Sequence, residues 1–238
     1  MTWRAFKYIA HLFYRRHRKG HGIHSPYLFG FINGVIFNSD RVSLAPGITA
    51  EHRRLRAEDP FVRSSSVSLK YGFLLYRISR WFRPEAIVEL GSGVGISTVY
   101  LALGSPETPL HSIERDKDRA ARAAQLICRY CPGPVSIHWG EMEEKLEYIL
   151  PQLPRRFMAF VDGNHHYEPT VEYIRRILER AGEESVIVMD DIYWSRGMFR
   201  AWKEVSSWPE VQVSIDLFHM GILLLKKDLP ETKIKIKF

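Results

Sequence analysis

The pattern of apolar and polar positions changes near Pro84. Before it, apolar residues recur at the three- and four-residue spacing of amphipathic helices, whereas after it short apolar runs alternate with helical segments. The runs that predict strands are 86–90, 109–114, 135–139, 157–161 and 185–190, and the helical segments that follow them are 95–103, 116–130, 142–150, 169–180 and 195–205. Five successive strand–helix units predict a doubly wound, mostly parallel sheet.

The end of the chain has a different pattern. Strand-like runs at 211–216 and 221–227 are separated only by residues 217–220, too short a connection for a helical crossover, so they must pair antiparallel. The alternating tail at 233–238 suits a charged edge strand. The expected fold class is α/β, a doubly wound three-layer sandwich. It has a mostly parallel seven-stranded sheet with its last strand antiparallel, plus an N-terminal helical extension.

Residues 1–63 are expected to form this N-terminal helical cap, and residues 64–238 the main domain. In the first helical segment, about Trp3 to Arg18, the apolar positions are Trp3, Phe6, Ile9, Ala10 and Phe13. We expect this apolar stripe to pack over the sheet edge and close a substrate site, with the basic side chains in solvent. A basic amphipathic helix also suits a membrane surface, a nucleic acid or a protein partner.

Composition and charge narrow the class of protein. The 238 residues are 45% hydrophobic and 26% charged, as in soluble globular proteins. No apolar stretch approaches the ~20 residues of a membrane-spanning helix or resembles a secretory signal, which predicts a cytoplasmic protein. The net charge is +7, but residues 1–20 hold six basic residues and no acidic one, which leaves the rest nearly neutral. The main domain is therefore not expected to be a nucleic-acid surface.

The two cysteines, Cys128 and Cys131, form a single C-x-x-C motif. A zinc ribbon needs a second pair, and a thioredoxin-like motif would open a helix rather than close one. Two reduced thiols are expected here.

Candidate chemistry begins after the first predicted strand, where Gly91, Gly93 and Gly95 form a glycine-rich turn. Ligands of open α/β sheets bind beyond the carboxyl ends of the strands. A dinucleotide fingerprint needs glycine where Ile96 stands, which disfavours a nicotinamide cofactor. Glu114 ends the second strand, where it can accept hydrogen bonds from ribose hydroxyls. The turn and the acid fit an adenosine-containing ligand; the alternative is a tight turn beside a solvated strand end.

Four motifs together resemble the class I S-adenosylmethionine-dependent methyltransferases, over residues 64–227. They are Val-Glu-Leu-Gly-Ser-Gly-Val-Gly at 88–95, Ser-Ile-Glu at 112–114, Val-Asp-Gly-Asn-His-His-Tyr at 161–167 and Val-Met-Asp-Asp at 188–191. The last two look most like small-molecule O-methyltransferases of the catechol-methylating type and their bacterial relatives. The resemblance implies direct transfer of a methyl group to a hydroxyl of a small molecule.

The resemblance also implies cofactor-binding residues. The glycine turn would line the methionine and ribose, Glu114 would bind the ribose, and Gly140 with Glu141 would border the adenine. The complete set expected to bind S-adenosylmethionine is Glu89, Gly91, Ser92, Gly93, Gly95, Ser97, Glu114, Arg115, Gly140, Glu141 and Asp162.

Three acids end the fourth and fifth strands: Asp162, Asp190 and Asp191. In the metal-dependent O-methyltransferases the equivalent positions are acid, acid and asparagine, and they hold Mg²⁺, which favours the deprotonated acceptor. Here Asp191 replaces the asparagine. The alternative is that no metal binds, with Asp162 contacting cofactor or substrate and Asp190 capping the next helix. The sequence leaves both alternatives open.

The general base is expected among His165, His166 and Asp162. Catechol-type enzymes place a lysine near here, but this chain has none between Asp162 and Arg175. A histidine can accept a hydroxyl proton near neutral pH; the alternative is that one ring packs on the adenine and the other is solvated. Tyr193 and Trp194 are candidates for the wall of an aromatic acceptor site or for simple packing.

Other function classes remain as alternatives. An RNA methyltransferase could use the basic N-terminus, but the Asn/Asp-Pro-Pro-Tyr motif of amino-group methylators is missing after the fourth strand. A non-catalytic S-adenosylmethionine-binding module and a dehydrogenase are the others. The expected partners are a small-molecule acceptor and no nucleic acid, with a weak membrane-surface contact through residues 1–20 and a homodimer as further options.

Overall fold

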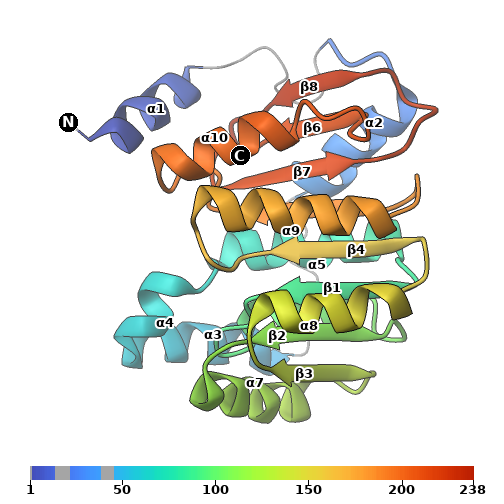
Figure 1. Ribbon diagram of the computed structural model, residues 1–238. Helices are drawn as coiled ribbons and strands as arrows, with labels where there is room; N and C mark the ends of the chain where they lie inside the picture. Colours follow the sequence, from blue (N-terminus) through green and yellow to red (C-terminus); the bar gives the residue numbers. More distant parts are fainter. Residues whose placement is uncertain (1, 14–21, 39–45) are drawn as a thin grey trace. The chain divides into compact units, whose positions relative to one another are not determined.

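The computed structural model describes residues 2–13, 22–38 and 46–238 (Figure 1). The chain divides into two compact units. The central unit is continuous and contains residues 39–154, whereas the terminal unit combines residues 1–38 with residues 155–238. These units are defined by compactness and do not test the expected division into an N-terminal extension, residues 1–63, and a main domain, residues 64–238. That division stays a prediction.

The central unit contains a parallel sheet in the order β3-β2-β1. Its strands are β1 (Ala86–Leu90), β2 (Leu110–Glu114) and β3 (Val135–Trp139), and its helices are α3 (Pro46–Glu58), α4 (Pro60–Ser65), α5 (Leu69–Phe82), α6 (Ile96–Gly104), α7 (Lys117–Tyr130) and α8 (Met142–Ile149), followed by the 3-10 turn η3 (Leu150–Gln152). β1 is buried along its whole length. Four of its five residues are apolar, with Glu89 as the one polar side chain, as expected for a parallel strand covered by helices.

A buried histidine fastens α3 to the rest of the central unit. His52 is fully buried; its Nε2 lies 3.0 Å from the carbonyl oxygen of Val67, and its Nδ1 lies 3.1 Å from the hydroxyl of Tyr100 on α6. A carbonyl can only accept, so Nε2 carries the proton and Nδ1 accepts from Tyr100. The neutral ring satisfies both partners, and burial lowers the pKa of His52 to about 4.

The terminal unit contains a mixed sheet in the order β4-β5-β7-β6-β8. Its strands are β4 (Phe157–Val161), β5 (Val186–Asp190), β6 (Val213–Asp216), β7 (Met220–Leu224) and β8 (Thr232–Lys235), and its helices are α1 (Trp3–Leu12), α2 (Pro26–Phe31), the π-helix η2 (Ile32–Ile36), α9 (Tyr167–Arg180) and α10 (Arg196–Val205). β4 and β5 are parallel, and β7 pairs antiparallel with both β5 and β6, as the short connection predicted.

The strand count differs from the expected seven. The described residues form eight strands, because the alternating tail adds β8 beside β6. β8 is parallel to β6, so the last strand is not the antiparallel one. The chain reverses direction after β7, and a strand that runs opposite to β7 must run the same way as β6. The expectation of a mostly parallel α/β sheet holds.

The orientation of α1 is opposite to the expected one. The apolar positions Phe6, Ile9 and Phe13 are exposed, whereas His11 is buried and Trp3 packs against the ring of Tyr193. The inward face is therefore made of aromatic and basic residues, which form specific contacts instead of a simple apolar seal. The part of the expected helix beyond residue 13 lies outside the described residues.

Both cysteines are free thiols, as expected. Cys128 is exposed, while burial raises the pKa of Cys131 to about 12. Among the described residues, no helix is long and apolar enough to cross a membrane.

The buried neutral His52 predicts a pH-dependent stability. Its pKa lies near 4 in the folded protein and near 6.5 in the unfolded chain, so the unfolded chain takes up a proton between these values while the folded protein does not. The free energy of unfolding should fall by about 3 kcal/mol through this group as the pH drops from 7 to 4. Urea denaturation across this range measures it. His52→Gln should show a shallower slope, and the exposed His166→Gln the full slope; equal slopes in all three proteins would contradict the assignment.

Candidate functional site

The turn after β1 is built from glycines with positive φ angles. Gly91, Gly93 and Gly95 have φ values of 93°, 52° and 89°, which side-chain-bearing residues rarely adopt. A Cβ added at Gly95 would lie 3.0 Å from the Cα of Ala123, so α7 packs directly on the backbone there. A Cβ at Gly93 would meet nothing within 4 Å. The turn is closed on the α7 side and open at Gly93, which leaves room for a ligand to approach the backbone.

Glu114 at the end of β2 holds this turn in place. Its Oε2 accepts a hydrogen bond from the backbone N–H of Gly93 at 2.8 Å, and its Oε1 accepts one from the N–H of Asp116 at 2.9 Å. Arg119 lies 3.2 Å from Oε1. The carboxylate is almost fully buried, and both oxygens are satisfied by donors. Ribose hydroxyls are donors of the same kind, so the carboxylate is a suitable acceptor for them.

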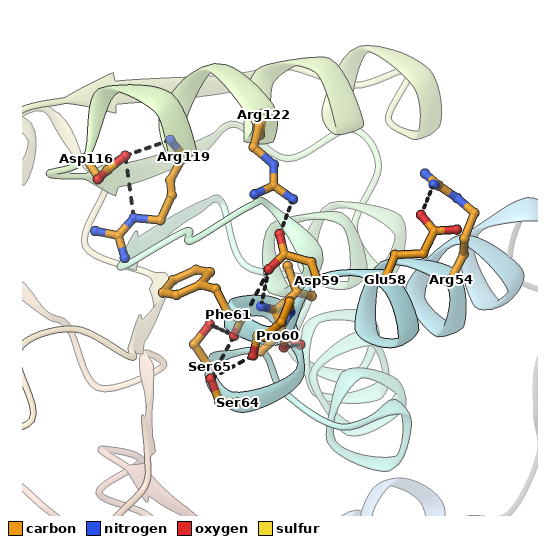
Figure 2. A network of polar contacts seen from close by, with 12 residues as sticks. Arg54, Glu58, Asp59, Pro60, Phe61, Ser64, Ser65, Asp116, Arg119 and Arg122 are labelled. Atoms are coloured by element: carbon orange, nitrogen blue, oxygen red, sulfur yellow. Dashed lines mark hydrogen bonds and ion pairs between the residues drawn. The ribbon is translucent and has the colours of Figure 1, made fainter.

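Helix α4 fixes the position of Arg119. Figure 2 shows Arg119 and Arg122 projecting from α7 toward the start of α4. Asp59 accepts from the backbone N–H groups of Phe61 and Val62 and pairs with Arg122 at 2.7 Å. The guanidinium of Arg119 lies 5.0 Å from the centre of the Phe61 ring. Sequence reasoning missed Arg119; its position one helical turn after the N-cap Asp116 was the available signal.

Glu89 is buried inside the unit instead of lining an open surface. Its Oε2 accepts hydrogen bonds from the hydroxyls of Thr98 and Ser112, each at 2.6 Å, and Ser97 also bonds to it. Burial raises the pKa of Glu89, although these hydroxyls oppose the shift. The Glu89 carboxyl group thus connects the start of α6 to β1 and β2, and so helps to hold the two ends of the glycine turn in place.

The region expected to border an adenine lies at the ends of β2 and β3. The N–H of Gly140 donates to the carbonyl of Glu114 at 3.0 Å, which keeps these two strand ends together. Arg115 and Glu141 are exposed. Trp139 is half exposed; its Nε1 donates to the carbonyl of Arg115 at 3.1 Å, and sequence reasoning did not consider it. Its position could have indicated a role, because Trp139 directly precedes Gly140 and Glu141, the residues expected to border the adenine.

The central unit therefore fits S-adenosylmethionine. All the predicted cofactor residues except Asp162 belong to this unit. Three buried polar atoms there, Ser92 Oγ, Glu89 Oε1 and Arg119 Nε, have no hydrogen-bond partner among the described residues, and Ser92 belongs to the glycine turn itself. Such orphaned groups favour a polar ligand, since a buried polar atom without a partner costs about 1–3 kcal/mol.

The terminal unit brings together the three acids at the ends of β4 and β5, as the parallel strands predicted. The pKa of Asp190 is raised well above its usual value, first by burial and then by the nearby charges of Asp162 and Asp191. Asp191 has a φ of 50°, so the chain turns sharply immediately after β5. Three carboxyl groups in one place require protons or positive charges beside them.

Of the two candidate histidines, only His165 is described beside the acids. Its Nε2 lies 3.3 Å from Asp162 Oδ1 and 4.0 Å from Asp191 Oδ2. The same nitrogen is buried and makes no hydrogen bond of good geometry among the described residues. His166 is exposed at the N-cap of α9.

A basic residue from α1 reaches the acid cluster, a contact that no sequence motif predicts. Arg4 Nη2 lies 3.3 Å from Asp191 Oδ1 and 3.4 Å from Nδ1 of His219, in the β6–β7 connection. Its guanidinium also lies 4.8 Å from the centre of the Trp194 ring, which is half exposed. Arg4 was expected in solvent with the other basic side chains of this helix, but it lies beside the acid cluster.

The acid cluster does not fit a magnesium site in its described geometry. No group of three or more His, Cys, Asp or Glu among the described residues is arranged to hold a metal ion. Instead, an oxygen of Asp191, the position that differs from asparagine in the metal-dependent enzymes, is paired with Arg4. The guanidinium supplies there the positive charge that a cation would otherwise bring.

Tyr193 is a packing residue, whereas Trp194 remains a candidate for the acceptor wall. The Tyr193 ring stacks on Phe218 at 4.6 Å, and its hydroxyl donates to Asp216 at 2.8 Å. Trp194 faces Arg4 on one side, and its ring centre lies 6.2 Å from that of His165.

The fold matches solved methyltransferase structures. The O-methyltransferase TomG of Streptomyces achromogenes, in complex with S-adenosylmethionine, is 22% identical with a TM-score of 0.61, over 81% of this chain and 95% of that chain. An O-methyltransferase of Bacillus cereus, in complex with S-adenosylhomocysteine, is 18% identical with a TM-score of 0.61, over 82% and 95%. An S-adenosylhomocysteine-bound methyltransferase of Podospora anserina is 13% identical with a TM-score of 0.63, over 74% and 86%.

These similarities establish the class I methyltransferase fold, an α/β sheet with helices on both sides. A family model described as a methyltransferase domain matches residues 88–192, a stretch that includes the glycine turn, Glu114 and the three acids. This match and the shared fold together confirm the resemblance inferred from the sequence. Comparison with curated protein sequences gives no match.

Substitution of Glu114 tests the cofactor site. Glu114→Gln keeps the shape of the side chain but removes its charge, so the affinity for S-adenosylhomocysteine should fall by about 10–100-fold. Calorimetric titration measures the affinity. The exposed Glu107→Gln, in the connection before β2, is the matched control and should bind as the wild type does. Unchanged binding by Glu114→Gln, with both variants folded, would exclude Glu114 as the ribose ligand.

Proposed function

We propose that this protein transfers a methyl group from S-adenosylmethionine to a hydroxyl of a small molecule. The observation that carries the proposal is His165, whose buried Nε2 lies 3.3 Å from Asp162 within the stretch that matches the methyltransferase domain. A histidine held by a carboxylate is a suitable general base for an alcohol or phenol. O-methyltransferases are also among the solved structures that share the fold.

The cofactor and the residues of the chain have separate tasks in this reaction. Bound S-adenosylmethionine supplies an electrophilic methyl group on a sulfonium. The turn from Gly91 to Gly95 and the carboxylate of Glu114 bind and orient it. Nε2 of His165 faces Asp162 and carries the proton toward that carboxylate, so the opposite ring nitrogen, Nδ1, accepts the proton of the acceptor hydroxyl. Asp162 stabilises the imidazolium that results. With the cofactor bound, this oxygen would displace the sulfur from the methyl carbon in line: the carbon–sulfur bond would break, and S-adenosylhomocysteine would leave without a covalent enzyme intermediate.

Arg4 takes the place of a divalent cation in the proposed mechanism. Because its guanidinium pairs with Asp191, the negative charge of the acid cluster is balanced from α1. No step is assigned to Mg²⁺, since the described residues do not fit it. Trp194 and Arg4 lie face to face at 4.8 Å, and this pair suits a flat, phenolic acceptor, with an aromatic surface on one side and a fixed positive charge beside it.

Substitution of His165 tests the proposed base. With a panel of phenols and alcohols, His165→Gln should lower the turnover number by about 10²–10⁴-fold, because general-base catalysis is lost. Release of S-adenosylhomocysteine measures turnover. Affinity for the cofactor should not change, since His165 is not among the residues proposed to bind it. If His166→Gln has the larger effect, the assignment of the two histidines is reversed.

A second experiment distinguishes a role of Arg4 in turnover from a role of Mg²⁺. Turnover by the wild type should be the same in Mg²⁺ and in chelator, whereas Arg4→Gln should lower it by about 10–100-fold and Arg4→Lys by less. Loss of wild-type activity in chelator, with recovery on addition of Mg²⁺, would overturn the role of Arg4.

The remaining alternatives give different results in the same assays. A binding module would bind S-adenosylhomocysteine but turn over none of the acceptors. An RNA methyltransferase would be active on RNA and would lose its binding steeply with salt.

A further inference from the structure

The outer face of α1 carries apolar side chains with no described partner. Phe6, Ile9, Ala10 and Phe13 are spaced as i, i+3, i+4 and i+7, so they share one side of the helix. The exposed fractions are 57% for Phe6, 43% for Ile9 and 75% for Phe13. We call this set the outer face. Monomeric soluble proteins rarely gather large apolar side chains in one exposed patch.

Specific contacts on the opposite side determine this orientation. Arg4 pairs with Asp191, and Nε2 of His11 lies 2.8 Å from the carbonyl oxygen of Ile236. The ring of Trp3 packs against Phe199, with centres 5.6 Å apart. The helix cannot rotate its apolar stripe inward without breaking all three contacts. These contacts hold the opposite side of α1 in the folded protein and leave the outer face exposed.

The charge of the N-terminal sequence indicates what covers this face. Residues 1–20 contain six basic residues and no acidic one, and four of these bases directly follow the outer face in sequence: Arg15, Arg16, Arg18 and Lys19. An apolar helical face followed in sequence by a cluster of basic residues is a combination that binds anionic lipid surfaces.

We propose that the outer face of α1 docks the protein on an anionic membrane surface, with the helix lying in the interface. Phe6, Ile9 and Phe13 insert among the acyl chains near the headgroups, and the basic residues that follow attract the negative lipids. A helix of ten residues is about 15 Å long and cannot span a bilayer, so the contact is peripheral. Binding should also weaken with salt, since part of the attraction is electrostatic.

Vesicle co-sedimentation of the full chain tests the proposal. The wild type should bind phosphatidylcholine vesicles that contain phosphatidylserine at least about tenfold more strongly than pure phosphatidylcholine vesicles. The double variant Phe6→Glu/Phe13→Glu should bind the anionic vesicles at least about tenfold more weakly, because two large apolar groups no longer insert. Tyr148→Glu on α8, also an exposed aromatic position, is the matched control and should bind as the wild type does.

Three results would overturn the proposal. The first is failure of the vesicle test: either the wild type does not bind anionic vesicles, or the double variant binds them equally well although its melting temperature equals that of the wild type. The second is a wild-type dimer, measured by light scattering, that the double variant converts to monomer; the outer face would then be a contact between two copies. The third is RNA binding that the double variant loses while vesicle binding persists.

Discussion

The crowding of three carboxyl groups at the ends of β4 and β5 is the constraint that organises the terminal unit. Parallel strands end at the same edge, so Asp162, Asp190 and Asp191 meet there whatever the rest of the chain does. Burial and mutual repulsion raise the pKa of Asp190, and the remaining negative charge attracts His165 and Arg4. The cluster thus accounts both for a base held beside a carboxylate and for a cationic side chain that comes from a helix at the other end of the sequence.

The ion pair with Asp191 is one of several contacts that hold the inward side of α1. The hydrophobic effect alone would bury Phe6, Ile9 and Phe13, but an ion pair at Asp191 and the rings around Tyr193 hold the opposite side of the helix. One helix therefore serves two surfaces: its inward side neutralises the acids, and its outward side remains apolar. A substitution at Arg4 acts on the site, whereas a substitution at Phe13 acts on a surface that the site does not use.

The sequence predicted the sheet well because buried parallel strands are short apolar runs, and the helices between them are amphipathic. It also predicted that the acids would converge, since that follows from strand direction alone. It could not predict Arg4, because a basic residue on an amphipathic helix normally lies in solvent and its partner is 187 residues away. The sequence left the metal alternative open for the same reason, since the residue that pairs with Asp191 is outside every motif. Arg119 was missed because its role depends on α4, in a polar stretch with no strong periodicity.

The two units also differ in when they can be completed during synthesis. The central unit is a continuous stretch, residues 39–154, whereas α1 is anchored to Asp191 and to Ile236, the latter 225 residues from His11. Chains grow at about 5–20 residues per second, so α1 waits for its partners on the order of ten seconds or more. During that time Arg4 and His11 lack the partners that they contact in the folded protein. The residues of the glycine turn are therefore synthesised about 100 positions before Asp191, with which Arg4 pairs in the folded protein.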